Sequence, residues 1–155
     1  MSYRIDGLSC QPFEHLFGAS EQELARHNAR RVVADSKPGF PCRVILEDAE
    51  PGEELLLLNY VSLETASPFR TAYAIYVREA LVEHAIYVDE LPPALRGRTL
   101  SLRGFDEEGM LRAALLTQPG EAEAGIHELF DQPEIATIHA HNAIPGCFAA
   151  RIERN

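Results

Sequence analysis

Between residues 42 and 152 the chain divides into short segments with a strand-like pattern, separated by turns that contain glycine, proline and acidic residues. Several segments alternate apolar and polar side chains, which is typical of half-buried strands. The expected strands are 42–47, 54–61, 69–79, 84–90, 99–105, 110–117 and the two arms of 138–152. Because short turns favour antiparallel neighbours, the pattern predicts an α+β fold with a predominantly antiparallel sheet or a partly closed barrel.

Two segments carry helical signals, so the expected fold contains two short helices. Ser20 followed by Glu23 forms a capping box, which predicts a short helix after Ser20. The second helix follows Thr117 and is indicated by apolar residues at helical spacing: Ala122, Ile126, Leu129 and Phe130. No repeat or linker divides the 155 residues, so we expect a single domain over residues 1–155.

The formal net charge of −10 constrains the partners of the protein. A nucleic-acid surface needs a basic stripe and an anionic membrane attracts basic segments, so we expect neither partner. The N-terminus shows no signal-peptide pattern, and the longest apolar run, Leu55–Leu58, is too short to span a bilayer. Three cysteines without CxxC spacing indicate a cytoplasmic, disulfide-free protein: Cys10, Cys42 and Cys147.

The segment IHAHNAIPGCFAARI (138–152) concentrates polar side chains in one expected hairpin. Successive strand residues face opposite sides, so His139 and His141 share one face. A loop over 142–146 would place Cys147 directly opposite His141. The remaining polar-face pairs would be His139 with Ala149 and Thr137 with Arg151, leaving Phe148, Ala150 and Ile152 on the core face.

Three hairpin residues are candidate catalytic residues, because imidazoles transfer protons near neutral pH and a stabilised thiolate is a nucleophile. They are His139, His141 and Cys147. The alternative is that these side chains pack under a helix and make only local hydrogen bonds.

The segment FRTAYAIYVRE (69–79) places two arginines and a tyrosine on one strand face, separated by alanines. The planar guanidinium group binds carboxylate and phosphate well, so this face predicts a trough for a small anion. The candidate ligand-binding residues are Arg70, Arg78, Tyr76, Arg43, Asn142 and Arg151. The alternative is a solvated edge whose arginines pair with surface carboxylates.

Three segments together carry a resemblance to a known family: PGFPCRVILEDAEPGEELLLLNY, SPFRTAYAIYVRE and IHAHNAIPGCFAARI. The chain resembles the bacterial family called domain of unknown function 1203, and the closing HxHN…GCFAAR pattern is the most recognisable part. The resemblance implies a stand-alone bacterial protein of about this length. It supplies no activity and no catalytic residues.

We therefore expect a small-anion-binding domain or an enzyme that uses an arginine and histidine face; no particular reaction or cofactor is indicated. One alternative is a non-catalytic module that forms a homodimer through a strand edge, because the apolar segment LLLLNYV must be covered by the core or by a second copy. Another is a metal site in which His139, His141 and Cys147 supply ligands of types that zinc accepts. His84 or water would complete that site.

Overall fold

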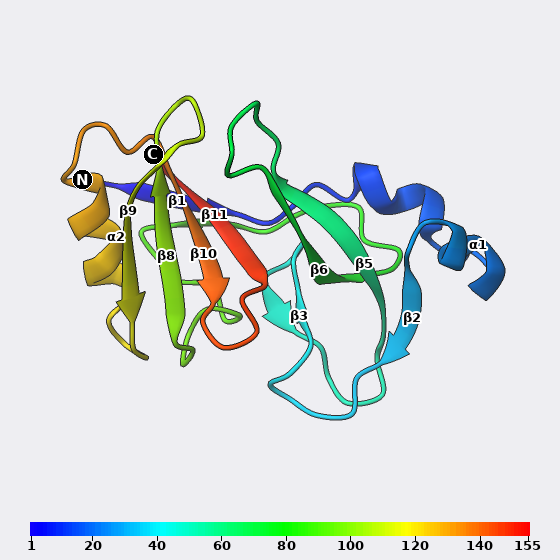
Figure 1. Cartoon of the computed structure of the whole chain (residues 1–155). Coiled ribbons are helices and arrows are strands. Elements are labelled where there is room, and N and C mark those ends of the chain that lie inside the picture. Colours follow the sequence, from blue (N-terminus) through cyan, green and yellow to red (C-terminus); the bar gives the residue numbers. More distant parts are fainter.

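The computed structural model of the protein describes residues 1–155 and contains two β-sheets that lie side by side (Figure 1). The elements, in chain order, are β1 (Tyr3–Asp6), the 3₁₀ helix η1 (Gln11–Leu16), α1 (Glu21–Arg26), β2 (Arg30–Val33), β3 (Pro41–Cys42), β4 (Glu47–Asp48), β5 (Glu54–Leu63), β6 (Thr71–Arg78), β7 (Ile86–Val88), β8 (Leu100–Phe105), β9 (Leu111–Thr117), α2 (Ala122–Phe130), β10 (Thr137–Asn142) and β11 (Phe148–Arg154).

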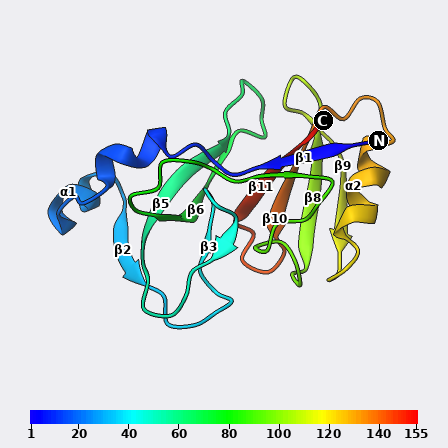
Figure 2. The same cartoon turned by 180° about the vertical axis from the view of Figure 1, so that it is seen from behind.

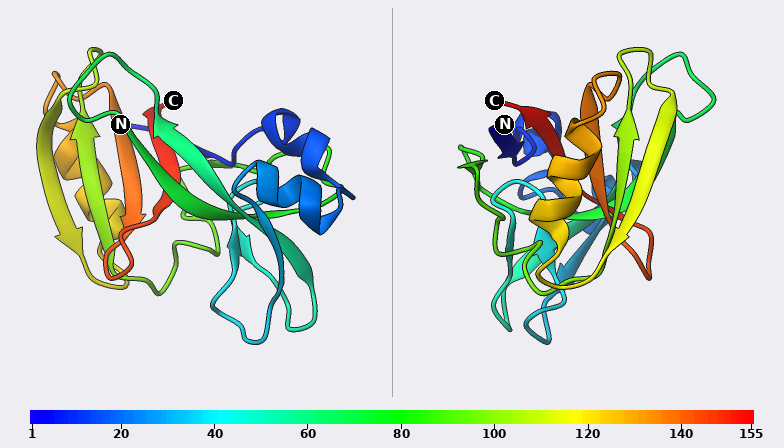
Figure 3. Two further views of the ribbon diagram at one scale, coloured as in Figure 1. Left: turned by 45° about the vertical axis from the view of Figure 1, so that its right-hand side comes forward. Right: turned by 90° about the vertical axis from the view of Figure 1, so that its left-hand side faces the viewer.

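The first sheet, sheet A, has six strands in the order β7-β1-β11-β10-β8-β9, and every neighbouring pair is antiparallel. Helix α2 covers one of its faces (Figure 3). Ile126 and Leu129 of this helix are fully buried against the sheet in a core that includes Leu102 and Ile138. The opposite face of sheet A carries the polar side chains of β8 and β10 and is turned toward the other sheet.

The second sheet, sheet B, has five strands in the order β2-β5-β6-β3-β4, and only the β3–β6 pair is parallel. The N-terminal helices η1 and α1 lie beside this sheet, and their side chains share its core: Phe13, Leu16 and Leu24. Leu55, Leu56 and Leu58 of β5 are buried in the same core. The apolar segment of β5 is therefore covered within the chain.

The two sheets are joined by backbone hydrogen bonds and by aromatic contacts. The chain that leaves β1 crosses toward sheet B (Figure 2), and there the Leu8 amide donates to the Arg43 carbonyl at 2.8 Å. From sheet B, the Tyr60 ring lies 6.0 Å from Phe148 and the Tyr73 ring lies 5.0 Å from His141, measured between centroids. The seam between the sheets is therefore built from side chains that face each other.

The predicted α+β fold with predominantly antiparallel sheets is confirmed, but the two sheets are separate and do not form a barrel. The cap of α1 is confirmed, since the Glu23 amide donates to Ser20 Oγ at 3.2 Å. Five elements were not predicted: β1, β2, the short strands β3 and β4, and the third helix, η1. None of the helices is long and apolar enough to cross a membrane.

The predicted strand over residues 42–47 is wrong. Strand β3 ends at Cys42, and the chain then makes a turn closed by the Leu46 amide, which donates to the Cys42 carbonyl at 2.9 Å. Val44 is buried in the core of sheet B, and Leu46 is buried in the core of sheet A. The alternation that resembled a strand comes from a buried turn that serves both cores.

The predicted register of the β10–β11 hairpin is also wrong. His139 pairs with Arg151, two residues away from the expected partner, and a β-bulge between Ala140 and His141 then pairs His141 with Phe148. Phe148 consequently lies on the histidine face, with its ring 5.3 Å from that of His139. Ala149, which was expected opposite His139, is part of the core beneath sheet A.

Candidate functional site

Arg43 is an arginine held almost entirely inside the protein, in the turn that follows β3. Its backbone is held against β6 of sheet B, because its amide donates to the Tyr76 carbonyl at 2.9 Å. Its side chain is 3 % exposed. Nε donates to the Phe148 carbonyl at 2.7 Å, and Nη1 donates to the Pro41 carbonyl. The guanidinium group is thus oriented by backbone oxygens from both sheets.

A cavity of about 580 Å³ opens in front of this arginine. It lies between β5 and β6 of sheet B, the loop at 98–99 and the β10–β11 loop. Its walls include four of the residues expected to form the site: Arg43, Tyr76, Asn142 and Cys147. Small-molecule sites commonly have volumes of about 300–1,000 Å³, so the cavity can hold an organic molecule. We call it the Arg43 cavity.

The charge in the Arg43 cavity is not neutralised by the protein. Arg98 also lines the cavity, but it makes a bidentate ion pair with Asp48, at 2.7 and 2.9 Å. Arg43 has no carboxylate partner and Nη2 makes no hydrogen bond within the protein. Burial, with a smaller contribution from the nearby Arg98, lowers the pKa of Arg43 to about 10, so the group stays protonated at neutral pH.

The remaining walls of the Arg43 cavity are mixed in character. Leu57, Ala74, Ile144 and Pro145 provide apolar surface. At the polar end, Asn142 Oδ1 is buried and has no hydrogen-bond partner. A charged group at the floor and apolar walls around it suit a molecule with one anionic end and one apolar end.

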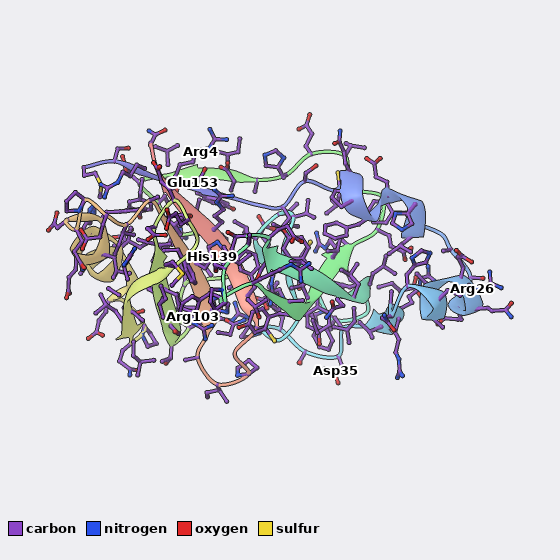
Figure 4. The ribbon with its side chains drawn as sticks, turned by 45° about the horizontal axis from the view of Figure 1, so that its top comes forward. Arg4, Arg26, Asp35, Arg103, His139 and Glu153 are labelled. Carbon is purple, nitrogen blue, oxygen red and sulfur yellow. The ribbon has the colours of Figure 1, made fainter.

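His139 and His141 lie outside the Arg43 cavity, on the face of sheet A that is turned toward sheet B. Direct cross-strand pairing places Arg103 of β8 and Arg151 of β11 on either side of His139. Figure 4 shows Arg103 and His139 close together on neighbouring strands. Both histidines line a smaller cavity of about 340 Å³. We call it the His139 cavity.

Both histidines are neutral imidazoles at physiological pH. Burial, together with smaller contributions from His141, Arg151 and Arg103, lowers the pKa of His139 to about 3. Burial also lowers the pKa of His141 to about 4, although Nδ1 lies 3.0 Å from the Gly146 carbonyl, and this contact opposes the shift. A neutral ring bonded in this way carries its proton on Nδ1, so Nε2 is an acceptor.

Arg70 and Arg78, expected on one strand face, do not converge on one site. Arg70 precedes the strand and pairs with Glu64, whereas Arg78 ends it and pairs with Glu53. The eight residues of β6 span about 26 Å at the usual rise per residue, which is too far for one small anion to bridge. Arg70 reaches the rim of the His139 cavity, and Arg78 lines neither cavity.

The structure divides the candidate catalytic residues between two places, because Cys147 lines the Arg43 cavity and the histidines line the other. No group of three or more His, Cys, Asp or Glu side chains is arranged to hold a metal ion, so the His139, His141 and Cys147 ligand set is not assembled. Arg151 pairs with its neighbour Glu153 on the surface.

Sequence reasoning missed two arginines that matter to these cavities. Arg103 is the cross-strand partner of His139, and Arg98 lines the Arg43 cavity. In the segment TLSLRGF, Arg103 alternates with the buried Leu100 and Leu102 and so lies on the opposite face of the strand. Its pairing with β10 is a long-range contact that no local pattern indicates. The sequence named Arg43 as a candidate but did not indicate that its side chain is buried, because burial of an arginine depends on long-range packing.

The architecture defines a two-sheet α+β protein with an unpaired arginine at the floor of a cavity in the seam. The chain belongs to the family described as "Protein of unknown function (DUF1203)", which matches residues 39–154. No curated protein and no solved structure matches the chain. The matched range contains all the residues that line the Arg43 cavity.

Proposed function

We propose that the protein binds a small organic anion in the Arg43 cavity, with the carboxylate or phosphate on the Arg43 guanidinium group. The observation that carries this proposal is a charged side chain, 3 % exposed, that faces a cavity without a carboxylate partner. Burying an ion is unfavourable unless it is paired, and a bound anion would supply the missing partner.

The shape and walls of the cavity favour an organic anion over an inorganic one. Leu57, Ala74 and Pro145 give the ligand's apolar part a surface to contact, and burial of that surface adds to affinity. The net charge of −10 repels anions at long range, so selective binding depends on this local arginine.

An enzymatic role has weaker support than binding. Cys147 is a free, partly exposed thiol in the same cavity, which is compatible with covalent chemistry. However, neither His139 nor His141 lines that cavity, so the proton-transfer groups expected beside the thiol are elsewhere. The proposal is therefore binding, in a protein that we expect to be cytoplasmic.

A thermal-shift and calorimetric titration tests the proposal with acetate, hexanoate, benzoate and inorganic phosphate. We expect the organic acids to raise the melting temperature of the wild type and hexanoate or benzoate to exceed acetate. Arg43→Met should weaken binding about ten- to a hundredfold, since it removes a charge-assisted hydrogen bond worth roughly 1.5–3 kcal/mol.

Two further variants control this experiment. Arg96→Met removes an exposed arginine that pairs with Glu90, and it should bind as the wild type does. Ala74→Phe keeps Arg43 and fills the cavity wall, so it should exclude the ligand even if Arg43→Met is poorly folded. Failure of every acid to stabilise the wild type would refute the proposal, as would equal binding by Ala74→Phe.

A further inference from the structure

We propose that the His139 cavity is a second, separate ligand site, and that it takes a small aromatic acid carrying a hydroxyl group. The cavity of about 340 Å³ lies in the seam, with Arg103, His139 and His141 from sheet A and Tyr73 from sheet B. Nothing in this inference depends on the Arg43 cavity.

The anion-binding element is Arg103, which has no carboxylate partner. Nη1 donates to the Tyr73 hydroxyl at 3.1 Å, and Nε donates to Ser101 Oγ at 3.3 Å. Both contacts orient the guanidinium group without neutralising it. Because the Tyr73 hydroxyl oxygen already accepts from Arg103, its own proton is available to donate to an anion.

The histidines supply hydrogen-bonding groups that the protein leaves unused. His139 is 2 % exposed and lines the cavity, yet neither of its ring nitrogens makes a hydrogen bond within the protein. His141 Nδ1 is occupied by the Gly146 carbonyl, which leaves Nε2 as an acceptor. These ring nitrogens lie at the wall of the cavity without a partner in the protein, so they are free to accept from a ligand that carries a hydroxyl donor.

The walls favour an aromatic ligand. Phe105 packs edge-on to His139 with centroids 5.2 Å apart, and Phe69 packs against Phe105 at 6.2 Å. Together with the Tyr73 ring, 5.0 Å from His141, these residues line the cavity with π faces and edges. Offset or edge-on contacts between aromatic rings stabilise beyond simple burial.

A metal ion is the less favourable occupant of this cavity. His139 has Arg103 and Arg151 as its direct cross-strand partners, and of these Arg103 lines the cavity without a carboxylate partner, whereas Arg151 pairs with Glu153. The field of Arg103 repels a cation and attracts an anion. The arrangement therefore pairs a cationic group for the carboxylate with neutral acceptors for the hydroxyl.

Calorimetric titration with 4-hydroxybenzoate, benzoate and acetate tests the inference, together with the histidine ring resonances in proton NMR spectra. We expect 4-hydroxybenzoate to bind more tightly than benzoate and acetate to bind weakest. The His139 and His141 ring signals, assigned with His139→Phe, should shift on titration. Arg103→Gln should weaken binding about ten- to a hundredfold and Tyr73→Phe about two- to tenfold.

Variants at the other site separate the two proposals. Arg43→Met should bind 4-hydroxybenzoate in the His139 cavity as tightly as the wild type, and Arg96→Gln should also bind it unchanged. Loss of 4-hydroxybenzoate binding in Arg43→Met would place the probe in the Arg43 cavity and overturn this inference alone. The absence of saturable binding, ring signals that do not move, or unchanged affinity in both Arg103→Gln and Tyr73→Phe would equally overturn it.

Discussion

Arg43, His139 and His141 are titratable side chains that are each at most 3 % exposed. The Arg43 guanidinium group remains protonated and is oriented by backbone carbonyls. The imidazole of His139 is neutral, because burial and the neighbouring arginines lower its pKa. Because burial makes a charge unfavourable, the protonation of the histidines opposes folding. Their chemistry in the folded protein is therefore that of hydrogen-bond donors and acceptors.

Because protonation of the two buried histidines opposes folding, acidification should lower the stability of the protein. The pKa values of His139 and His141 are lower in the folded protein than the usual 6.5, so the unfolded chain binds more protons below that pH. Stability present above pH 6.5 is then lost as the pH falls toward the folded values. Between pH 6.5 and 5 we expect a loss of about 1–2 kcal/mol for each histidine in the free energy of unfolding.

Urea unfolding from pH 5 to pH 7 measures this loss, and His139→Phe is the informative variant. The phenyl ring can occupy the place of the imidazole between Phe105 and Phe148. Unfolding of the variant should take up about one proton fewer than unfolding of the wild type, so its free energy of unfolding should fall less steeply as the pH is lowered. An identical pH dependence in both proteins would show that His139 already titrates normally in the folded state.

At the level of elements, the β10–β11 hairpin decides where the polar side chains point. The alternation of residues correctly predicted that His139 and His141 share a face. The bulge at Ala140 and His141 was not predicted from the alternation; it places Phe148 on the histidine face, where its ring lies 6.0 Å from Tyr60 of the other sheet. Cys147 consequently lies in the loop region that lines the Arg43 cavity.

The segment after β1 should be intolerant of any side chain at Gly7. A Cβ atom there would lie 1.8 Å from the Val44 carbonyl oxygen, which belongs to the backbone of the buried turn. We expect Gly7→Ala to lower the free energy of unfolding by about 3 kcal/mol or more, since the backbone cannot move aside as a side chain can.

Gly39→Ala is the matched control in the same denaturation experiment. Its Cβ would lie 3.0 Å from the Ser36 hydroxyl, which can rotate away, and at an ordinary contact distance of 3.7 Å from the Ser36 carbonyl oxygen. The change in stability should stay within about 1 kcal/mol. If Gly7→Ala were as stable as Gly39→Ala, the close crossing of the chain between the sheets would be wrong.

At the level of the whole molecule, each sheet has its own core, and the seam between them contains both cavities. The expectation of a single domain over residues 1–155 remains a prediction, as do the cytoplasmic location, the free thiols in solution and a homodimer. The seam contains aromatic contacts and the Arg43 contact to Phe148. We expect these contacts to couple the two sheets.

Native-state hydrogen exchange tests that coupling. The most protected amides of β5 and β6 and those of β8 and β10 should exchange through the same global unfolding, with free energies that agree within about 1 kcal/mol. Two sets of amides separated by several kcal/mol would show that the sheets unfold independently and that the chain has two domains.

The sequence predicted most strands of sheet A and the two long strands of sheet B, β5 and β6, because alternation and turns are local signals. It did not predict how the strands divide into two sheets, since β1 joins the sheet that ends the chain and β2 joins β5. Four candidate residues meet in the Arg43 cavity, but Arg70 and Arg78 separate because a strand between them is extended. Sites assembled from distant segments depend on that long-range pairing.

The most direct test of anion binding is a crystal structure of the protein with 4-bromobutyrate, whose bromine gives an anomalous signal. The account predicts the carboxylate about 2.7–2.9 Å from the Arg43 guanidinium group and the bromine against Leu57 and Ala74. An Arg43 cavity without the acid at a saturating concentration, or a carboxylate bound away from Arg43, would contradict it.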